Sequence, residues 1–306
     1  MVLPNGYNTL PNTIINDAVM GGFGIAGDTF YVDVNAGVDT NDGLSWLTPL
    51  KTLAAAIVLS NASIAAGASG WAARNRIYYK GDNNEAAAET LITLANKCDI
   101  VGVGSYDHRP TPMMIGNHVI GAGAYMGCRF INMGFLSPAA GGVIFTVPTT
   151  TSGLAFIGCH FDGRSTTPAT KAIVATAVEQ LTIEGCRFFG KFSTTTIDIG
   201  TGSSRALLIR NNLIESGAIG ITVHASATCA DAIGQIIGNT FNVVTLVIDE
   251  NSDKMAIIDN KGTTLAADSK LTSVIDFNAA LSCNNLFTCG TGVTAIYPAQ
   301  AAITGP

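Results

Sequence analysis

A short motif recurs along this chain and constrains its fold more than any other feature. It consists of two apolar residues spaced two apart, two further residues, a Cys or Asn, any residue, and another apolar residue. The Cys or Asn of successive copies lies at positions 98, 128, 159, 186, 212, 239, 260 and 284. A repeat of this length built from strand-like segments predicts a solenoid, in which every repeat packs only on its neighbours.

Each repeat contains more than one predicted strand. Apolar residues at alternate positions indicate a strand with one buried face, and the shift of phase at the Cys or Asn indicates a bend between two strands. Further β-branched segments lie between the motifs, at 143–147, 173–176, 196–199, 219–223, 246–248 and 274–277. We therefore expect an all-β, single-stranded parallel β-helix of about eight coils, roughly 34 Å long at the usual strand spacing.

The Cys and Asn residues of the motif are predicted to stack at one corner of the coil. Buried Cys packs as a small apolar group, and buried Asn side chains one coil apart can hydrogen-bond along the stack. The predicted ladder comprises Cys128, Cys159, Cys186, Asn212, Asn239, Asn260 and Asn284. Two alternatives remain for the cysteines, a metal site formed by the first three and disulfides between neighbouring coils.

A second motif precedes the repeats. A strand-like segment at 30–33 is followed by an Asx-rich turn at 39–45 and an apolar stripe that includes Leu50, Leu53 and Ile57. Thr48 can cap a helix with Pro49 at its first position, and this helix would close the end of the solenoid. The predicted divisions are an N-terminal arm (1–28), the first strand and capping helix (29–75), the β-helix (76–290) and a C-terminal tail (291–306).

Together these motifs resemble the right-handed parallel β-helix proteins of the pectin-lyase-like superfamily, over about residues 29–290. The likeness is greatest to phage virion members of the decoration and tailspike type. The resemblance implies a right-handed coil, in agreement with the usual hand of parallel crossovers. It also implies that such chains commonly form homotrimers. The superfamily includes polysaccharide lyases and hydrolases as well as non-catalytic proteins, so the fold does not decide the function.

Composition narrows the function classes. Charged residues make up 12% of the chain, with 16 basic and 22 acidic side chains and a net charge of −6. These values argue against a disordered chain and against a nucleic-acid partner. No uncharged stretch reads as a membrane-spanning helix, and residues 1–7 do not resemble a signal peptide. The resemblance to virion proteins implies a virion protein, which we expect to be made in the host cytoplasm and to need no cofactor.

Three sets of surface residues are candidates for function. Arg129, His160 and Arg187 follow the three motif cysteines and are expected to form a stripe for an anion or acidic sugar. Loops that shorten along the chain predict a flared patch, partly exposed and suited to a subunit interface, at Phe135, Leu136, Phe189 and Phe192. Alternating oxygen ligands suggest a calcium loop at Asp33, Asn35, Asp39 and Asp42.

Paired carboxylates, which glycoside hydrolysis needs, are not evident, because the acidic residues are scattered over different strand positions. Glu184 and Arg210 occupy equivalent positions in neighbouring repeats and are expected to form a surface ion pair. We therefore expect a non-enzymatic structural protein, a capsid decoration protein or short spike, that forms a trimer and docks on other virion proteins through its tails. The alternatives are a polysaccharide lyase or glycoside hydrolase and a glycan-binding adhesin.

Overall fold

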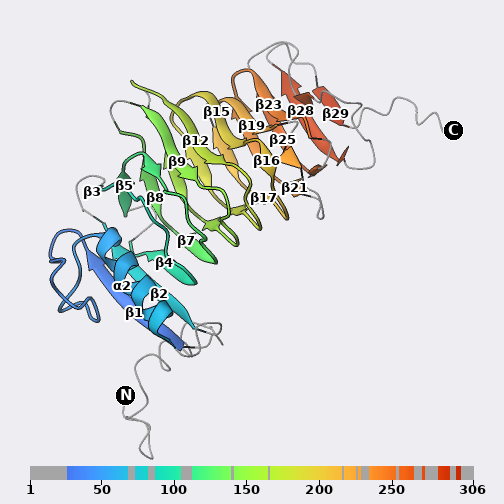
Figure 1. The fold of residues 1–306 in the computed structure, drawn as a ribbon. Coiled ribbons are helices and arrows are strands. Elements are labelled where there is room, and N and C mark those ends of the chain that lie inside the picture. The colour runs from blue at the N-terminus through green and yellow to red at the C-terminus, as the bar shows by residue number, and fades with distance from the viewer. Residues whose placement is uncertain are drawn as a thin grey trace, which may run out of the picture.

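A computed structural model describes residues 26–67, 73–81, 87–104, 112–138, 141–164, 166–215, 217–224, 227–228, 234–252, 255–264, 271–272, 282–289 and 294–297. The chain forms a β-solenoid whose coils stack into a rod, with β1 toward one end and β28 and β29 toward the other (Figure 1). The predicted parallel β-helix is thus confirmed. Residues 1–25 of the predicted arm, most of the tail and the strand expected at 274–277 lie outside the described residues.

Three parallel sheets form the walls of the solenoid. The first contains β1 (Ala26–Asp33), β2 (Arg74–Lys80), β4 (Cys98–Gly102), β7 (Cys128–Ile131), β10 (Ala155–Ile157), β13 (Thr182–Glu184), β17 (Leu208–Arg210), β21 (Gly234–Ile237), β24 (Met255–Ile258) and β27 (Ser282–Cys283). The second contains β3 (Ala87–Ala88), β5 (Met113–Ile115), β8 (Gly134–Leu136), β11 (His160–Asp162), β14 (Arg187–Phe189), β18 (Leu213–Glu215), β22 (Thr240–Val243), β25 (Lys261–Thr264), β28 (Asn285–Cys289) and β29 (Thr294–Tyr297). In this sheet β29 pairs antiparallel with β28.

The third sheet contains β6 (His118–Val119), β9 (Gly142–Val147), β12 (Ala169–Ala175), β15 (Phe192–Ile199), β19 (Gly217–Val223), β23 (Leu246–Glu250) and β26 (Leu271–Thr272). A separate parallel pair joins β16 (Gly202–Ser203) to β20 (Ala227–Thr228). Each coil therefore runs from the first sheet to the second and then to the third. Because parallel neighbours come from consecutive coils, every apolar row continues along the rod axis.

The bend from the first to the second sheet depends on one left-handed residue per coil. Successive coils use Asn132, Gly158, Gly185, Asn211, Gly238, Asp259 and Asn284, with φ between 53° and 65°. The residue after each bend points into the core and forms the ladder Met133, Cys159, Cys186, Asn212, Asn239, Asn260 and Asn285. Asn284, predicted as a ladder member, is instead the left-handed residue, and Asn285 takes the buried place.

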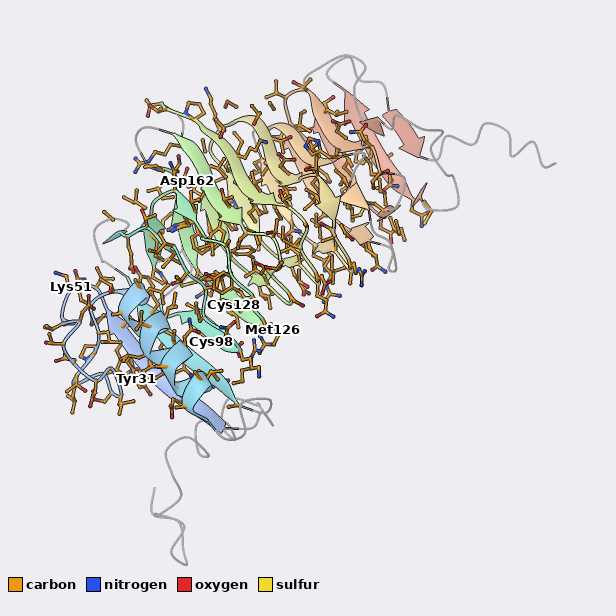
Figure 2. The ribbon with its side chains drawn as sticks, in the orientation of Figure 1. Tyr31, Lys51, Cys98, Met126, Cys128 and Asp162 are labelled. Atoms are coloured by element: carbon orange, nitrogen blue, oxygen red, sulfur yellow. The ribbon has the colours of Figure 1, made fainter. Side chains whose placement is uncertain are left out.

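Cys128 belongs to another corner, which corrects the predicted ladder. It pairs with Cys98 at the start of the first-sheet strands (Figure 2), and Phe130 two residues later pairs with Phe156. A left-handed residue, Gly127, precedes it, as at the other corner. Both corners therefore produce the same apolar-Gly-Cys-polar-apolar pattern, which is why the sequence alone aligned Cys128 with Cys159.

The Asn part of the ladder is a continuous chain of hydrogen bonds. Asn212 Nδ2 donates to Asn239 Oδ1 at 2.9 Å, and Asn239 Nδ2 donates to Asn260 Oδ1 at 3.0 Å. Asn260 Nδ2 donates in turn to Asn285 Oδ1 at 2.9 Å. Each Nδ2 also donates to a backbone carbonyl of the preceding coil, such as Ile209 O for Asn239. These buried amides thus find partners in the neighbouring coils, as burial of a polar group requires.

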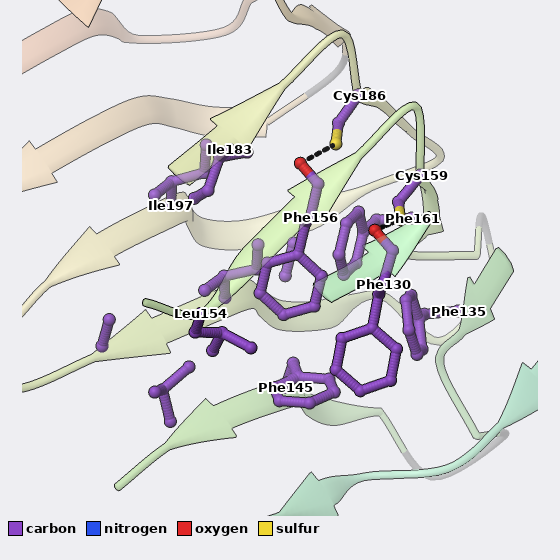
Figure 3. Packing of buried hydrophobic residues seen from close by; sticks show 14 of the residues in the cluster. Phe130, Phe135, Phe145, Leu154, Phe156, Cys159, Phe161, Ile183, Cys186 and Ile197 are labelled. Atoms are coloured by element: carbon purple, nitrogen blue, oxygen red, sulfur yellow. Dashed lines mark hydrogen bonds between the residues drawn. The ribbon is translucent and has the colours of Figure 1, made fainter. Parts of the chain in front are cut away.

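Aromatic side chains fill the middle of the core (Figure 3). Phe130 stacks on Phe156 with ring centroids 5.4 Å apart, and Phe161 stacks on Phe188 at 4.8 Å. Phe145 from the third sheet meets Phe156 edge-on at 5.0 Å. The in-register parallel strands place like residues above one another, which produces these stacks.

Helix α2 (Leu53–Ala66) lies across β1 and β2 at the N-terminal end of the rod (Figure 1). Its N-cap is Thr52, whose Oγ1 accepts the Ala55 N–H at 3.2 Å, so the predicted start at Thr48 and Pro49 is wrong. Leu50 is instead extended and bridges to Val32 of β1, because this pairing covers the edge of the first sheet. Leu53, Ala56 and Ile57 are buried, as expected for a cap on the core.

Gly158 tests the importance of the left-handed bend. A Cβ at this glycine would meet no atom within 4 Å, so a substitution there changes mainly the backbone energy. We expect Gly158→Val to lower the free energy of unfolding by about 2 kcal/mol and Gly158→Asn by less than about 1 kcal/mol, since Asn adopts positive φ more readily. Urea unfolding of the two variants measures this, and equal losses would contradict it.

Candidate functional site

The predicted Arg–His–Arg stripe is divided between two sheets. Arg129 lies in β7 of the first sheet, opposite Asp99 and Ala155. His160 and Arg187 are direct neighbours in the second sheet. The division follows from the misalignment of Cys128 described above, so the structure does not bring the three residues together.

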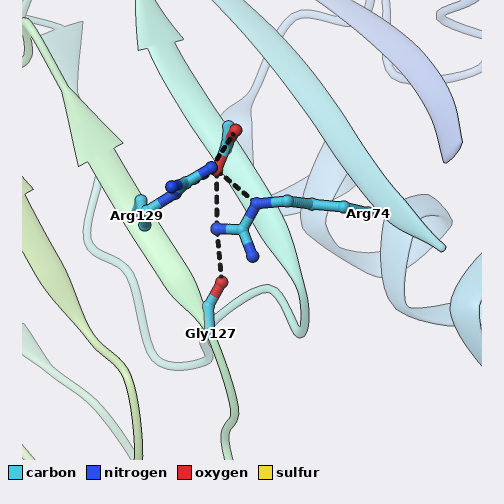
Figure 4. Close-up of polar contacts among 4 residues, drawn as sticks. Arg74, Gly127 and Arg129 are labelled. Carbon is cyan, nitrogen blue, oxygen red and sulfur yellow. Dashed lines mark hydrogen bonds and ion pairs between the residues drawn. The ribbon is translucent and has the colours of Figure 1, made fainter. Parts of the chain in front are cut away.

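Arg129 and Arg74 share the carboxylate of Asp99 (Figure 4). Arg129 binds it through Nε and Nη2 at 2.6 and 2.7 Å, and Arg74 Nε donates to it at 2.7 Å. Arg74 also donates to the Gly127 carbonyl at 2.9 Å. Burial alone would raise the pKa of Asp99, but the hydrogen bonds from the two arginines hold it below its usual value. Two guanidinium groups on one carboxylate leave this cluster with excess positive charge.

His160 and Arg187 do not form an open anion site. His160 is fully buried, and its ring meets Phe189 edge-on at 4.1 Å. Arg187 Nε donates to Glu215 at 3.1 Å, and its guanidinium lies 5.8 Å from the centre of the Phe189 ring. The predicted pair of Glu184 and Arg210 is confirmed, with 2.7 Å between the charged atoms.

The predicted interface patch is largely buried. Phe135, Leu136 and Phe192 are 0%, 8% and 1% exposed, and Phe189 is half-buried. The first and third of these side chains point inward as members of the core, because the short strands begin immediately after the corner and not in a flared loop. These four residues therefore do not provide the exposed aromatic surface that loop lengths suggested.

The three carboxylates of the suggested calcium loop serve separate turns, and Asn35 donates its N–H to Asp33 Oδ1 at 3.0 Å. Asp33 accepts the Ala36 N–H and pairs with Lys80, whereas Asp39 accepts Thr52 Oγ1 at 2.9 Å. Asp42 accepts Thr48 Oγ1 at 2.7 Å. Among the described residues, no three His, Cys, Asp or Glu side chains are grouped so that they could hold a metal ion.

The buried cysteines are free thiols. Burial raises the pKa of Cys98 to about 12 and raises that of Cys186 well above its usual value. Cys159 and Cys186 each donate to a carbonyl of the preceding coil at 3.3 Å. Cys98, Cys128, Cys159, Cys186 and Cys283 are all unbridged. The metal and disulfide alternatives therefore find no support at these positions.

One charged cluster was missed by the sequence analysis. Asp198 of β15, with a side chain 6% exposed, binds Lys171 Nζ of β12 and His224 Nε2, the latter at 3.0 Å. The separations along the chain, 27 and 26 residues, equal one coil. That spacing is the signal that could have identified the cluster, because groups one coil apart on a solenoid are neighbours.

His118 is the other buried titratable group that stands out. Its Nδ1 accepts the Leu91 N–H at 3.1 Å, and its ring packs on Phe135 and Phe145. Burial lowers the pKa of His118 to about 4.

We expect the free energy of unfolding to fall as the pH decreases from about 6.5 to 4. In that range the unfolded chain binds a proton at residue 118 and the folded chain does not. This difference lowers the free energy of unfolding by up to about 3 kcal/mol. His118→Asn keeps an acceptor for Leu91 but does not titrate, so its stability should depend less on pH. Urea unfolding at several pH values measures the difference, and parallel pH profiles for the two proteins would contradict the prediction.

No family model, curated protein or solved structure matches this chain. Among the described residues, no helix has both the length and the apolar character needed to cross a bilayer. The class of protein that the fold defines is a parallel β-solenoid with helix α2 over its N-terminal end.

Proposed function

We propose that this chain is a non-enzymatic structural subunit of a phage-like virion, a decoration protein or short spike, that assembles as a homotrimer. The observation that carries the proposal is that charged side chains form ion pairs between the coils. The ion pairs join residues of neighbouring coils: Lys80–Asp33, Arg74–Asp99, Arg129–Asp99, Lys171–Asp198, Arg187–Glu215 and Arg210–Glu184.

These ion pairs stabilise the stacking of the coils, as the core also does. Single exposed pairs contribute little, but several in succession, from β1 to β7 and again from β12 to β18, oppose separation of these coils at the surface. The Asn ladder does the same inside, where each amide binds the coils on both sides. A rod whose coils are joined by ion pairs toward its N-terminal end and by the Asn ladder toward its C-terminal end suits a load-bearing part of a particle.

The low charge of the chain, 12% of residues, supports a place within a larger assembly. Such a chain has few charged side chains to cover its surface, and large exposed apolar areas mark contact sites. The partners would be two further copies of this chain and other capsid or tail proteins. The resemblance to virion β-helix proteins is the reason for choosing a virion among possible assemblies.

Light scattering after size exclusion tests the assembly. The expected mass is about three times 31.5 kDa. A monomer at all concentrations would overturn the homotrimer. Incubation with acidic polysaccharides tests the non-enzymatic part, and new unsaturated or reducing ends would overturn it.

A second candidate function is a polysaccharide lyase or glycoside hydrolase, which the Lys171–Asp198–His224 cluster favours. A buried carboxylate that binds one imidazole nitrogen can orient a histidine as a general base, and the His224 side chain is 46% exposed. Product formation by the wild type that is lost in His224→Gln would support this candidate. Product formation that survives in His224→Gln would exclude this cluster as its source.

A further inference from the structure

The outer face of the first sheet carries an unusual row of residues. Consecutive strands β1, β2, β4, β7 and β10 place Tyr31, Tyr78, Val101, Ile131 and Ile157 in register. All five are half-buried, and their strand neighbours on either side point into the core or toward the corner. We call these five residues the apolar row.

Such a row is unexpected on a face that meets water. Residues on the solvated face of a sheet are normally polar, and the same row does become polar at Glu184 and Arg210. The two tyrosine rings stack on each other with centroids 5.7 Å apart. Stacking along the row covers part of each side chain, but the outer surface stays apolar over five coils.

The loop at 38–47 extends this surface at the N-terminal end. Trp46 meets Tyr31 edge-on at 4.9 Å, and Leu47 is 93% exposed. The loop is held in place, because Gly43 O accepts the Tyr31 N–H at 2.7 Å and Asp42 Oδ1 accepts the Leu44 N–H at 3.1 Å. A fixed loop that presents a leucine to water is typical of a contact surface.

The 38–47 loop and the surroundings of the apolar row carry charges of opposite sign. Asp39 and Asp42 are exposed in the 38–47 loop. Arg74 and Arg129, with side chains 30% and 41% exposed, flank the apolar row and share the single carboxylate of Asp99. The acidic part lies at the outer edge of β1, where Gly43 and Leu50 bond to the β1 backbone, and the arginines lie on the second and fourth strands counted from that edge.

We propose that the apolar row and the 38–47 loop form the contact between copies of this chain. The loop of one copy lies against the arginine-flanked row of the next, so that carboxylates meet guanidinium groups and Leu47 and Trp46 meet the apolar row. Two different patches in contact make a head-to-tail interface, which closes into a ring when the rotation allows. The axial offset between the loop and the arginines sets how far neighbouring rods are shifted along their axes. The inference deepens the proposed assembly and rests on it.

Matched substitutions test this contact. Leu47→Asp and Ile131→Glu place a charge in the two halves of the interface, and both side chains point outward. Val244→Asp and Ile237→Glu are the controls, since Val244 is 45% exposed and Ile237 occupies the same row of the first sheet beyond Arg210. Light scattering over a range of concentrations measures assembly, and thermal unfolding shows that each variant is folded.

We expect Leu47→Asp and Ile131→Glu each to raise the concentration for half-assembly about 100-fold, as loss of a central contact does. The two controls should stay within about 3-fold of the wild type. If all four variants assemble like the wild type, this contact is overturned and the proposed assembly stands on another face. A wild type that is monomeric at its highest soluble concentration overturns both.

Discussion

Asn239→Ala is expected to lower the free energy of unfolding by about 4 kcal/mol. Asn239 is fully buried, and its Oδ1 accepts the Asn212 N–H at 3.0 Å as well as the Asn212 Nδ2 bond. Its Nδ2 donates to Ile209 O. Alanine leaves the Asn212 N–H and the Ile209 carbonyl buried without these partners, and water has no access to replace them. Urea unfolding monitored by circular dichroism measures the loss.

Cys186→Asn is the matched control for that substitution. Cys186 occupies the same corner, its N–H donates to Asn212 Oδ1 at 2.8 Å, and its Sγ donates to Phe156 O. An Asn there can direct Nδ2 to Phe156 O and Asn212 Oδ1 and so lengthen the ladder. We expect a stability within about 1 kcal/mol of the wild type. Equal destabilisation by both substitutions would show that the amide chain is not the source of the effect.

Phe156→Ala is also expected to lower the free energy of unfolding by about 4 kcal/mol. Phe156 is fully buried and packs against Phe130, Phe135, Phe145 and Phe161, so that its ring touches side chains from all three sheets. Removal leaves a cavity that short in-register strands cannot close, because each is fixed by ladders on both sides. Thermal and urea unfolding both report this change.

Phe189→Ala serves as the comparison for the core substitution. Phe189 is half-buried and contacts His160 and Arg187 at the surface of the second sheet. The loss of this ring should lower the free energy of unfolding by only about 1 kcal/mol, since water can fill the space. A similar loss in both phenylalanine variants would contradict the distinction between core and surface rings.

The fold could be recognised from the sequence because a solenoid repeats its local chemistry. The recurring apolar-x-apolar spacing and the bend residues describe each coil, and stacking follows when coils of similar length pack on one another. The Asn ladder at 212, 239 and 260 was predictable for the same reason. The closing of the N-terminal end by an apolar helix was also predictable, although Leu50 pairs with β1 and so delays its start to Leu53.

The candidate sites were less predictable, and one misplaced cysteine explains much of the difference. Both corners use a left-handed residue before a buried side chain, so Gly127-Cys128 and Gly158-Cys159 read alike. This similarity placed Arg129 in one stripe with His160 and Arg187, although Arg129 lies in the first sheet and the other two residues lie in the second. The prediction that Phe135 and Phe192 are partly exposed fails for a related reason, because loop length does not reveal which face a short strand presents.

Local patterns in the chain therefore determine the coil, the bend residues and the apolar rows, since these depend on neighbours in sequence. The register between coils decides the rest. It sets which side chains separated by 25 to 30 residues become neighbours, as for Arg74, Asp99 and Arg129. A shift of a few residues in one coil moves a side chain to another sheet without altering its local pattern, and only packing of the whole rod selects among those shifts.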